Sequence, residues 1–289
     1  MESYEPFANR LHCHSLSSDG SLSPTELIQR AAANGVKLLS LTDHDTVAGQ
    51  QEAFDAANVE GISMVPGIEL SCVWGNFTIH VLAYNYDLNS GLMQEIEAKQ
   101  LQSRHQRAEL IAEKLEKKGF PGLLDAARAL TQSGIPGRPH FAQAMIDLAY
   151  VSDHNEAFKK YLGAGKVGDV KSLWPELKDM VNSIVNAKGS AVVAHPRKYN
   201  MTLTKLRNML VEFKAQGGEG IEVVTSGQKQ GEVGMLSDLC QRMGLKGSIG
   251  SDFHSPEYRW AELGRIPSLP KSVLPVWQEW EAFQSLELQ

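Results

Sequence analysis

The chain has 289 residues, of which 42% are hydrophobic and 21% are charged, so it can bury the core of one large α/β domain or of one domain with an insertion. The formal net charge of -6 argues against a broad basic surface for long nucleic acids, although a local cationic pocket or bound divalent metals could still hold phosphate. The three cysteines make neither a disulfide framework nor a CxxC zinc site, and no apolar run approaches the length of a membrane span. Residues 1–10 carry no signal-peptide pattern, so we expect a soluble cytoplasmic protein that acts on small or short anionic substrates.

The first candidate site residues are His12 and His14, which stand one residue apart in a segment that we expect to be extended. Side chains of a strand alternate with period two, so both imidazoles would point the same way, as two ligands of one metal ion do. Cys13 would then face the opposite side, and we interpret it as a small buried hydrophobe. An isolated His-x-His pair is weak evidence, so the prediction of a metal site depends on the rest of the chain.

Strand and helix patterns alternate after this pair. A capping box at residues 23–26, with proline at the first helical position, predicts a helix that Gly35 ends. Apolar strands are predicted at residues 36–41, 62–68 and 78–84, and an alanine-rich helix at about 47–57. Histidines and carboxylates follow these strands or lie within them, which indicates a polar site at one edge of the sheet.

The sequence changes character between residues 88 and 170, where charged, helix-forming segments contain no convincing strand. We interpret this stretch as a helical insertion or cap, and its charged run at residues 95–118 as a solvated helix face. Helices are then predicted at residues 175–187, 203–215 and 228–243, with strands at 191–194 and 220–224 and near 247–250. The predicted divisions are therefore 8–87, 88–170 and 171–289, with a closing helix after Arg265.

Six of the nine histidines fall on or just after predicted strands, together with four carboxylates. These residues are His12, His14, His44, His80, His195 and His254, with Asp19, Asp43, Glu69 and Asp252. Repeated βα units predict a parallel sheet, whose carboxyl edge would gather these ligands in a barrel or doubly wound site. Imidazole and carboxylate without thiolate suit zinc, manganese or iron, and the number of carboxylates permits more than one ion. Any one histidine could instead satisfy a hydrogen bond in the core, but the whole set favours a polynuclear metal site.

The same residues form ordered motifs that resemble the PHP (polymerase and histidinol phosphatase) superfamily. The motifs are His12-x-His14 with Asp19, Thr42-Asp43-His44-Asp45, Glu69, His80, Ala194-His195-Pro196 and Gly250-Ser251-Asp252-x-His254. The resemblance implies a distorted (β/α)7 barrel with a helical insertion, and metal-dependent hydrolysis of phosphoesters. It also implies three ligand groups, which are His12, His14, Glu69 and Asp252 for one ion, Glu69, His80 and His195 for a second, and Asp19, His44 and His254 for a third.

The resemblance further implies two or three divalent ions, with Mn2+ expected first and Zn2+ or Fe2+ as alternatives. The expected reaction is in-line attack on phosphorus by hydroxide that the paired ions generate. Glu69 would bridge and position the ions, and Asp252 would orient or deprotonate the nucleophile. His195 or His254 would assist the leaving oxygen.

Two further stretches, 137–142 and 195–199, resemble the branch of nucleoside 3',5'-bisphosphate phosphatases and related 5'-to-3' exoribonucleases. The expected substrates are a nucleoside 3',5'-bisphosphate or a short 5'-phosphorylated RNA; neither long duplex nucleic acid nor a membrane is an expected partner. The fork-shaped guanidinium of Arg138 can grip a phosphate in two places. The other candidate substrate contacts are Asp45, His140, Arg197 and Lys198.

Two alternatives remain open from the sequence. A histidinol-phosphate-type phosphatase would hydrolyse a small phosphomonoester without a base, and a metal-stabilised interaction domain would have no catalysis.

Two further positions, Arg10 and Glu222, bear on the predicted site. Arg10 stands where many relatives have an aspartate, two residues before the first histidine. Glu222 stands at a predicted strand end and could be a further polar residue of the pocket, but we interpret it as a solvated strand terminus.

Overall fold

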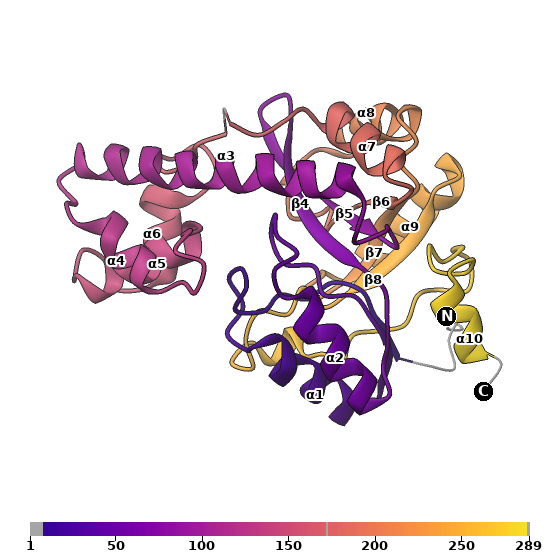
Figure 1. Ribbon diagram of the computed structural model, residues 1–289. Coiled ribbons are helices and arrows are strands. Elements are labelled where there is room, and N and C mark those ends of the chain that lie inside the picture. The colour runs from indigo at the N-terminus through magenta and orange to yellow at the C-terminus, as the bar shows by residue number, and fades with distance from the viewer. Residues whose placement is uncertain (1–7, 172, 288–289) are drawn as a thin grey trace.

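The computed structural model describes residues 8–171 and 173–287, and its strands form two hydrogen-bonded sheets (Figure 1). The small sheet is parallel and has the order β1 (Ala8–Arg10), β2 (Val36–Leu39) and β3 (Ser63–Met64). The large sheet has the order β4 (Gly67–Trp74), β5 (Phe77–Tyr84), β6 (Ser190–Val193), β7 (Gly220–Thr225) and β8 (Lys246–Gly250). The fold is therefore mixed α/β, and the strands of the described residues do not close into one hydrogen-bonded ring.

The large sheet corrects the expectation of a wholly parallel arrangement. β4 and β5 pair antiparallel along eight residues each, and β5 also pairs antiparallel with β6, while β6, β7 and β8 are parallel. Only two residues separate β4 from β5, whereas a parallel neighbour needs a crossover of a dozen or more. Gly75 supplies the left-handed backbone of this turn, with φ 55°.

The predicted strand at 62–68 is also wrong in its extent, because it is two strands, β3 and β4, separated at Val65 and Pro66. Proline has no N–H to donate to a sheet ladder, which explains the break. Glu69 consequently lies inside β4 and not after the end of a strand. Its backbone still meets the neighbouring site loop through a bridge with His44.

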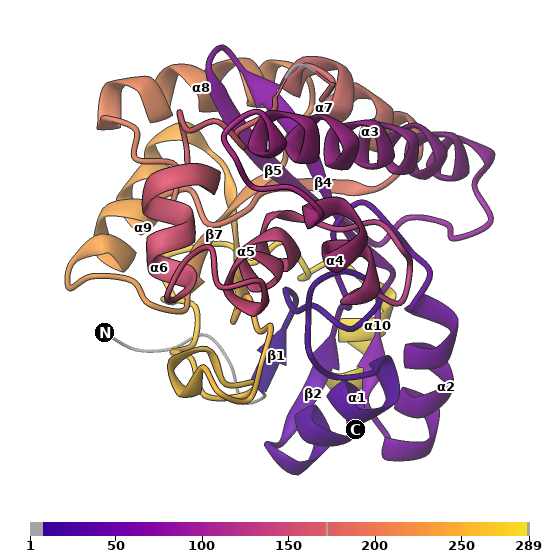
Figure 2. The same cartoon turned by 90° about the vertical axis from the view of Figure 1, so that its left-hand side faces the viewer.

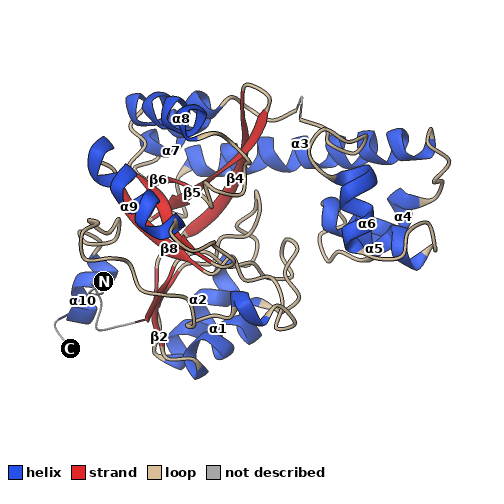
Figure 3. Cartoon of the chain, turned by 180° about the vertical axis from the view of Figure 1, so that it is seen from behind, coloured by secondary structure: helices blue, strands red, loops and turns tan. Residues whose placement is uncertain are grey.

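Helices cover both sheets on their outer sides (Figure 3). α1 (Pro24–Ala33) and α2 (Gln50–Glu60) lie beside the small sheet, and α7 (Leu177–Asn186), α8 (Leu203–Ala215) and α9 (Glu232–Met243) beside the large one. The predicted capping box of α1 is confirmed, since the Ser23 side chain accepts a hydrogen bond from the Glu26 N–H. After Arg265 the chain is mostly irregular, and the only described helix there is α10 (Glu281–Glu287), preceded by the short 3-10 turn η2 (Arg259–Ala261).

The segment 88–170 contains five helical elements, and its described residues include no strand. They are α3 (Gly91–Glu116), α4 (Leu123–Ala129), α5 (Arg138–Asp147), α6 (His154–Ala157) and the π-helical turn η1 (Phe158–Leu162). α3 runs outward from the sheets, and α4, α5 and α6 lie at its far end (Figure 1). These helices have a core of their own that includes Ile111, Phe141 and Met145, and Figure 2 views the molecule from their side. None of the helices in residues 8–171 and 173–287 is long and apolar enough to cross a membrane.

Candidate metal centre

The segment that carries His12 and His14 follows β1 and is held between two neighbours. Cys13 forms an isolated parallel bridge with Phe253, and its N–H donates to Thr42 Oγ1 over 3.2 Å. Cys13 itself has no exposed surface and its thiol donates to the Ser40 carbonyl, so the prediction of a small buried hydrophobe is confirmed. The two histidines are also fully buried, and their Nε2 atoms lie 3.1 Å apart.

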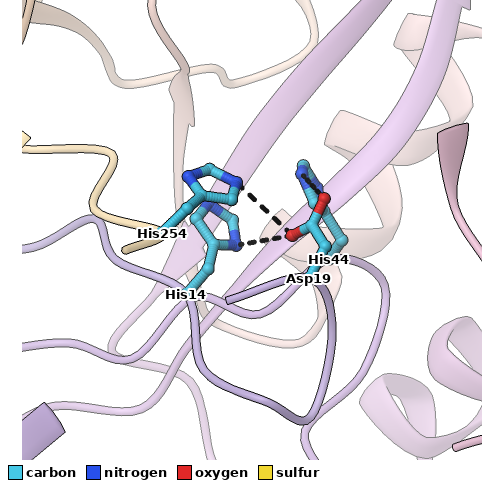
Figure 4. Close-up of side chains that lie close together, drawn as sticks. All are labelled: His14, Asp19, His44 and His254. Carbon is cyan, nitrogen blue, oxygen red and sulfur yellow. Dashed lines mark ion pairs between the residues drawn. The ribbon is translucent and has the colours of Figure 1, made fainter. Parts of the chain in front are cut away.

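One group of ligands surrounds the carboxylate of Asp19 (Figure 4). Its oxygens lie 3.3 Å from His254 Nε2, 3.9 Å from His44 Nε2 and 4.0 Å from His14 Nδ1. The rings of His14 and His254 stack with their centroids 4.2 Å apart. One ligand atom from each of the four residues lies within 4.8 Å of all the others, so this group could hold one ion.

Glu69 lies between the remaining candidate ligands, and both of its oxygens face them. Its Oε2 is 3.0 Å from His44 Nδ1, 3.2 Å from His14 Nε2 and 3.3 Å from His12 Nε2. Its Oε1 is 3.0 Å from both His80 Nδ1 and His195 Nε2. A carboxylate in this position can bind two ions at once.

Asp252 completes the cluster on the side of the first two histidines. Its Oδ1 lies 3.4 Å from His12 Nε2 and 3.3 Å from His14 Nε2, and its Oδ2 accepts a hydrogen bond from Lys198 Nζ. Groups that could hold an ion are therefore His12, His14 and Asp252; His12, Glu69 and His195; and His44, Glu69 and His80, beside the Asp19 group. The structure thus brings together the nine residues of the three predicted ligand groups, whereas Asp43 lies in none of these groups and accepts hydrogen bonds from Ser15 and Ser18.

Several buried polar atoms of the cluster make no hydrogen bond of suitable geometry, namely Nδ1 of His14, His44 and His195 and Oε2 of Glu69, although His44 Nδ1 and Glu69 Oε2 lie 3.0 Å apart. A buried polar atom without a partner costs about 1–3 kcal/mol, so four at one point are hard to explain by hydrogen bonding alone. Bound cations would satisfy them. The nitrogen and oxygen donors, without thiolate, fit divalent zinc, manganese or iron.

The charges of the cluster point to the same conclusion. Burial acts to raise the pKa of Glu69, but His44, His12 and His80 hold it well below its usual range. Burial acts to lower the pKa of His14, yet the neighbouring carboxylates of Asp252 and Glu69 raise it to about 10. The carboxylates therefore stay ionised and attract cations, which can be protons on the histidines or metal ions in their place.

Glu222 corrects an expectation, because it is fully buried in β7 and does not lie at a solvated strand end. Its Oε1 lies 3.0 Å from His12 Nδ1, and its Oε2 accepts a hydrogen bond of 2.7 Å from the His195 N–H. A carboxylate behind a histidine ligand fixes the tautomer and the ring orientation. In the sequence, the sign of this role is a single acid inside the otherwise apolar strand Gly220–Thr225, every residue of which is buried.

Backbone geometry also shapes the centre. His195 and Asp252 have φ values of 26° and 52°, a left-handed region that non-glycine residues rarely adopt and that is common at functional sites. Gly250 lies directly against His12, since a Cβ atom there would be 2.2 Å from His12 Cβ. At Gly20 a Cβ would be 2.3 Å from the His14 carbonyl oxygen, so both glycines permit a close approach that a side chain would prevent.

A cavity of about 270 Å³ lies between the ligands and the insertion, and we name it the arginine cavity. Arg104, Arg107 and Arg138 line it, together with the aromatic rings of Phe158 and Trp174. The two arginines on α3 lie within the run interpreted as a solvated helix face, and that interpretation is wrong for them. The signal in the sequence was the spacing of Gln100, Arg104 and Arg107, which places all three on one face of a helix.

The predicted substrate residues separate into two sets. Arg138 and Lys198 line the cavity, where Arg138 Nη1 donates to the Leu162 carbonyl over 3.2 Å. Arg197 is not among the described residues that line it, because its Nε donates to Glu232 Oε1 over 3.1 Å. His140 Nδ1 accepts a hydrogen bond of 3.0 Å from the Gly137 N–H at the start of α5.

Asp45 is fully buried beside the candidate ligand His44, and its oxygens are occupied by protein groups. It accepts hydrogen bonds from the Ser71 N–H over 2.7 Å, from Gln100 Nε2 over 2.7 Å and from Arg104 Nη1 over 2.8 Å. This geometry suits a residue that positions Arg104 at the cavity. The side chain of Arg10, in contrast, lies outside the part of the chain that the structure describes.

Comparisons with known proteins agree with this geometry. The chain is 43% identical over 269 residues to a 5'-3' exoribonuclease of Haemophilus influenzae, covering 93% of this chain and 97% of that protein. It is 39% identical over 278 residues to a 3',5'-nucleoside bisphosphate phosphatase of Chromobacterium violaceum, covering 94% and 96%. A solved structure of an amidohydrolase from Chromobacterium violaceum superposes with a TM-score of 0.87 at 36% identity, over 97% of this chain and 96% of that one. A family model described as the PHP domain matches residues 10–192, and the chain therefore belongs to the PHP domain family, as its motifs predicted.

Proposed function

We propose that this protein is a metal-dependent phosphoester hydrolase that removes the 3'-phosphate from nucleoside 3',5'-bisphosphates. Stepwise release of 5'-nucleotides from short 5'-phosphorylated RNA is a related activity of the same site. The observation that carries the proposal is the ligand cluster around Glu69, which adjoins a cavity lined by three arginines. The names of two relatives, at 43% and 39% identity, support both activities.

The cluster would hold two or three divalent ions, with Mn2+ as the first expectation. Such ions lower the pKa of bound water and neutralise charge that develops on phosphoryl oxygens. Glu69 would keep two ion sites at a fixed separation, because its two oxygens face different histidines. Glu222 would keep the His12 ring in the orientation that its Nε2 needs as a ligand donor.

The remaining residues of the centre would handle the nucleophile and the leaving group. Asp252 has one oxygen beside His12 and His14 and the other beside Lys198, so it can orient the attacking water. His254 and His195 both line the cavity and are candidates to protonate the leaving oxygen.

The arginine cavity would hold the second phosphate of the substrate. Burial, together with the neighbouring Arg138 and Arg104, holds the pKa of Arg107 below its usual range. Crowded guanidinium groups of this kind are stabilised by an anion, and each can make two parallel hydrogen bonds to a phosphate. The binding energy of the 5'-phosphate would then align the scissile bond at the ions.

We also propose the finer description of the fold as a distorted (β/α)7 barrel, divided into residues 8–87, an insertion at 88–170, and 171–289. Single contacts between the two sheets support it. The Leu11 N–H donates to the Ile249 carbonyl over 3.3 Å, and His44 bridges to Glu69.

The test of the function is a comparison of adenosine 3',5'-bisphosphate with 3'-AMP, 5'-AMP and histidinol phosphate in the presence of Mn2+. We expect the bisphosphate to have the highest kcat/KM, because only it places one phosphate at the ions and the other in the arginine cavity. If 3'-AMP or histidinol phosphate is hydrolysed as efficiently as the bisphosphate, the protein is instead a generic or a histidinol-type phosphatase.

A further inference from the structure

A second cavity, of about 350 Å³, opens from the metal centre on another side, and we name it the outer arm. It shares five lining residues with the arginine cavity, namely Thr78, His80, Arg138, His195 and Lys198. The two cavities are therefore the two arms of one groove, and they meet at the candidate ligands. A nucleoside bisphosphate would occupy the centre and the arginine cavity, which leaves the outer arm without a role in that reaction.

The outer arm is lined by groups that suit a nucleoside. Phe77 and Tyr199 contribute aromatic rings, and Asn76 and Asn200 contribute amides. The Tyr199 hydroxyl is already used, since it donates to the Ala194 carbonyl over 2.8 Å, so this residue offers its ring alone. Aromatic rings stack on bases, and amides can both donate to and accept from base edges.

The outer end of this arm is open to solvent. Asn76, Ala164 and Asn200 are all exposed, whereas Arg107 of the arginine cavity is only 8% exposed. The 5' end of a chain can bind at the buried arginines, and a chain that continues can leave past the exposed residues of the outer arm.

The two arms also differ in available charge. Arg138 and Lys198 line both arms, and the outer arm adds Lys171, whose Nζ lies 2.9 Å from Asp169 Oδ2. The arginine cavity adds Arg104, which lies 2.8 Å from Asp45 Oδ2, and Arg107, whose Nε donates to the Val170 carbonyl. The arginine cavity therefore suits a terminal phosphate, which carries up to two charges, and the outer arm suits a base and a singly charged diester.

We propose that the outer arm binds the nucleotide on the 3' side of the scissile phosphate in a 5'-phosphorylated RNA. The inference rests on the proposed function and adds a second nucleotide site to it. Water attacks phosphorus and the bond from phosphorus to the 3'-oxygen of the first nucleotide breaks, so that oxygen takes a proton and a 5'-nucleotide leaves. The phosphate stays on the downstream chain as its new 5'-phosphate, which is the group that the arginine cavity accepts in the next cycle.

The test compares adenosine 3',5'-bisphosphate with 5'-phosphorylated diadenylate, which differs from it only by the downstream adenosine. Ala164→Glu places a carboxylate at the exposed end of the outer arm, and Phe77→Leu removes an aromatic ring while keeping an apolar side chain. We expect each variant to lower kcat/KM on the dinucleotide about tenfold, through charge repulsion or the loss of one stacking contact. Activity on the bisphosphate should change less than about twofold, because that substrate does not enter the arm. Ala129→Glu is the matched control, at an exposed alanine of α4 outside the residues that line either cavity, and it should change neither activity.

A second measurement distinguishes failure of the proposed function from failure of the outer-arm proposal. It is calorimetric binding of a dinucleotide that has a methylene group in place of the scissile 3'-oxygen. If the wild type hydrolyses neither substrate, the proposed function fails, but an approximately tenfold weaker affinity of Ala164→Glu for this analogue still supports the outer arm. Unchanged affinity in Ala164→Glu, or parallel losses on both substrates in Ala164→Glu and Phe77→Leu, overturns the assignment of the arm.

Discussion

Replacing the buried Glu222 by glutamine tests whether the residue behind His12 controls the metal centre. The change keeps the size of the side chain but removes the charge that faces His12 Nδ1 at 3.0 Å and the His195 N–H at 2.7 Å. A hydrogen bond to a charged group contributes about 1.5–3 kcal/mol and a neutral one about 1 kcal/mol, so each contact should lose about 1 kcal/mol. Loss of such an outer carboxylate lowers metal affinity about 10- to 100-fold, which fits two weakened contacts.

The assay is competition for Mn2+ against a chelator of known affinity, combined with circular dichroism to establish that the variant is folded. Glu232→Gln is the matched control, because Glu232 accepts from Arg197 away from the ligands and should leave the metal affinity unchanged. Activity of Glu222→Gln should recover at high Mn2+, since the ligands themselves remain. A folded variant with wild-type affinity, or equal losses in both variants, would refute the reasoning about His12.

Three further outcomes follow from the geometry. Glu69→Gln and Asp252→Asn should each abolish turnover at saturating Mn2+ while circular dichroism stays unchanged, and near wild-type kcat in either would reject their roles at the ions. Arg138→Ala should lose about 2–3 kcal/mol of preference for a 5'-phosphate, measured as kcat/KM on the bisphosphate against 3'-AMP. Arg197→Ala, paired outside the cavity, should keep that preference, and equal effects of the two would contradict the arginine cavity. Elemental analysis after reconstitution with Mn2+ should find two or three ions per chain, and fewer than one would count against the cluster.

The candidate ligands could be predicted because metal chemistry limits the choice of residue. Imidazole and carboxylate are costly inside a core, so a set of them on apolar strands indicates a shared partner. His12 and Asp252 lie 240 positions apart in the sequence, and only the order of strands brings them together. The resemblance of the motifs supplied that order, which periodicity alone does not contain.

The parts that could not be predicted depend on packing between distant segments. Glu222 resembles any acid near a strand end until the structure places His12 Nδ1 beside it. Arg104 and Arg107 belong to a charged helix whose solvent-facing side has the same composition, and only the position of α3 over the ligands distinguishes them. The antiparallel pairing of β4 and β5 leaves one signal in the sequence, a glycine in the two-residue turn, whereas repeated βα units predict a parallel sheet.

The insertion has its own hydrophobic core and is joined to the sheets mainly through α3, which has a consequence for how such proteins diverge. The three arginines of the arginine cavity lie on the insertion, whereas the candidate metal ligands lie outside it. Changes in the insertion can therefore alter which phosphate compound is accepted without disturbing the ligands. Asp45 is the exception, since it adjoins His44 and holds Gln100 and Arg104 of α3. Asp45 should tolerate few substitutions, because a change there would disturb both the candidate ligand His44 and the α3 residues Gln100 and Arg104.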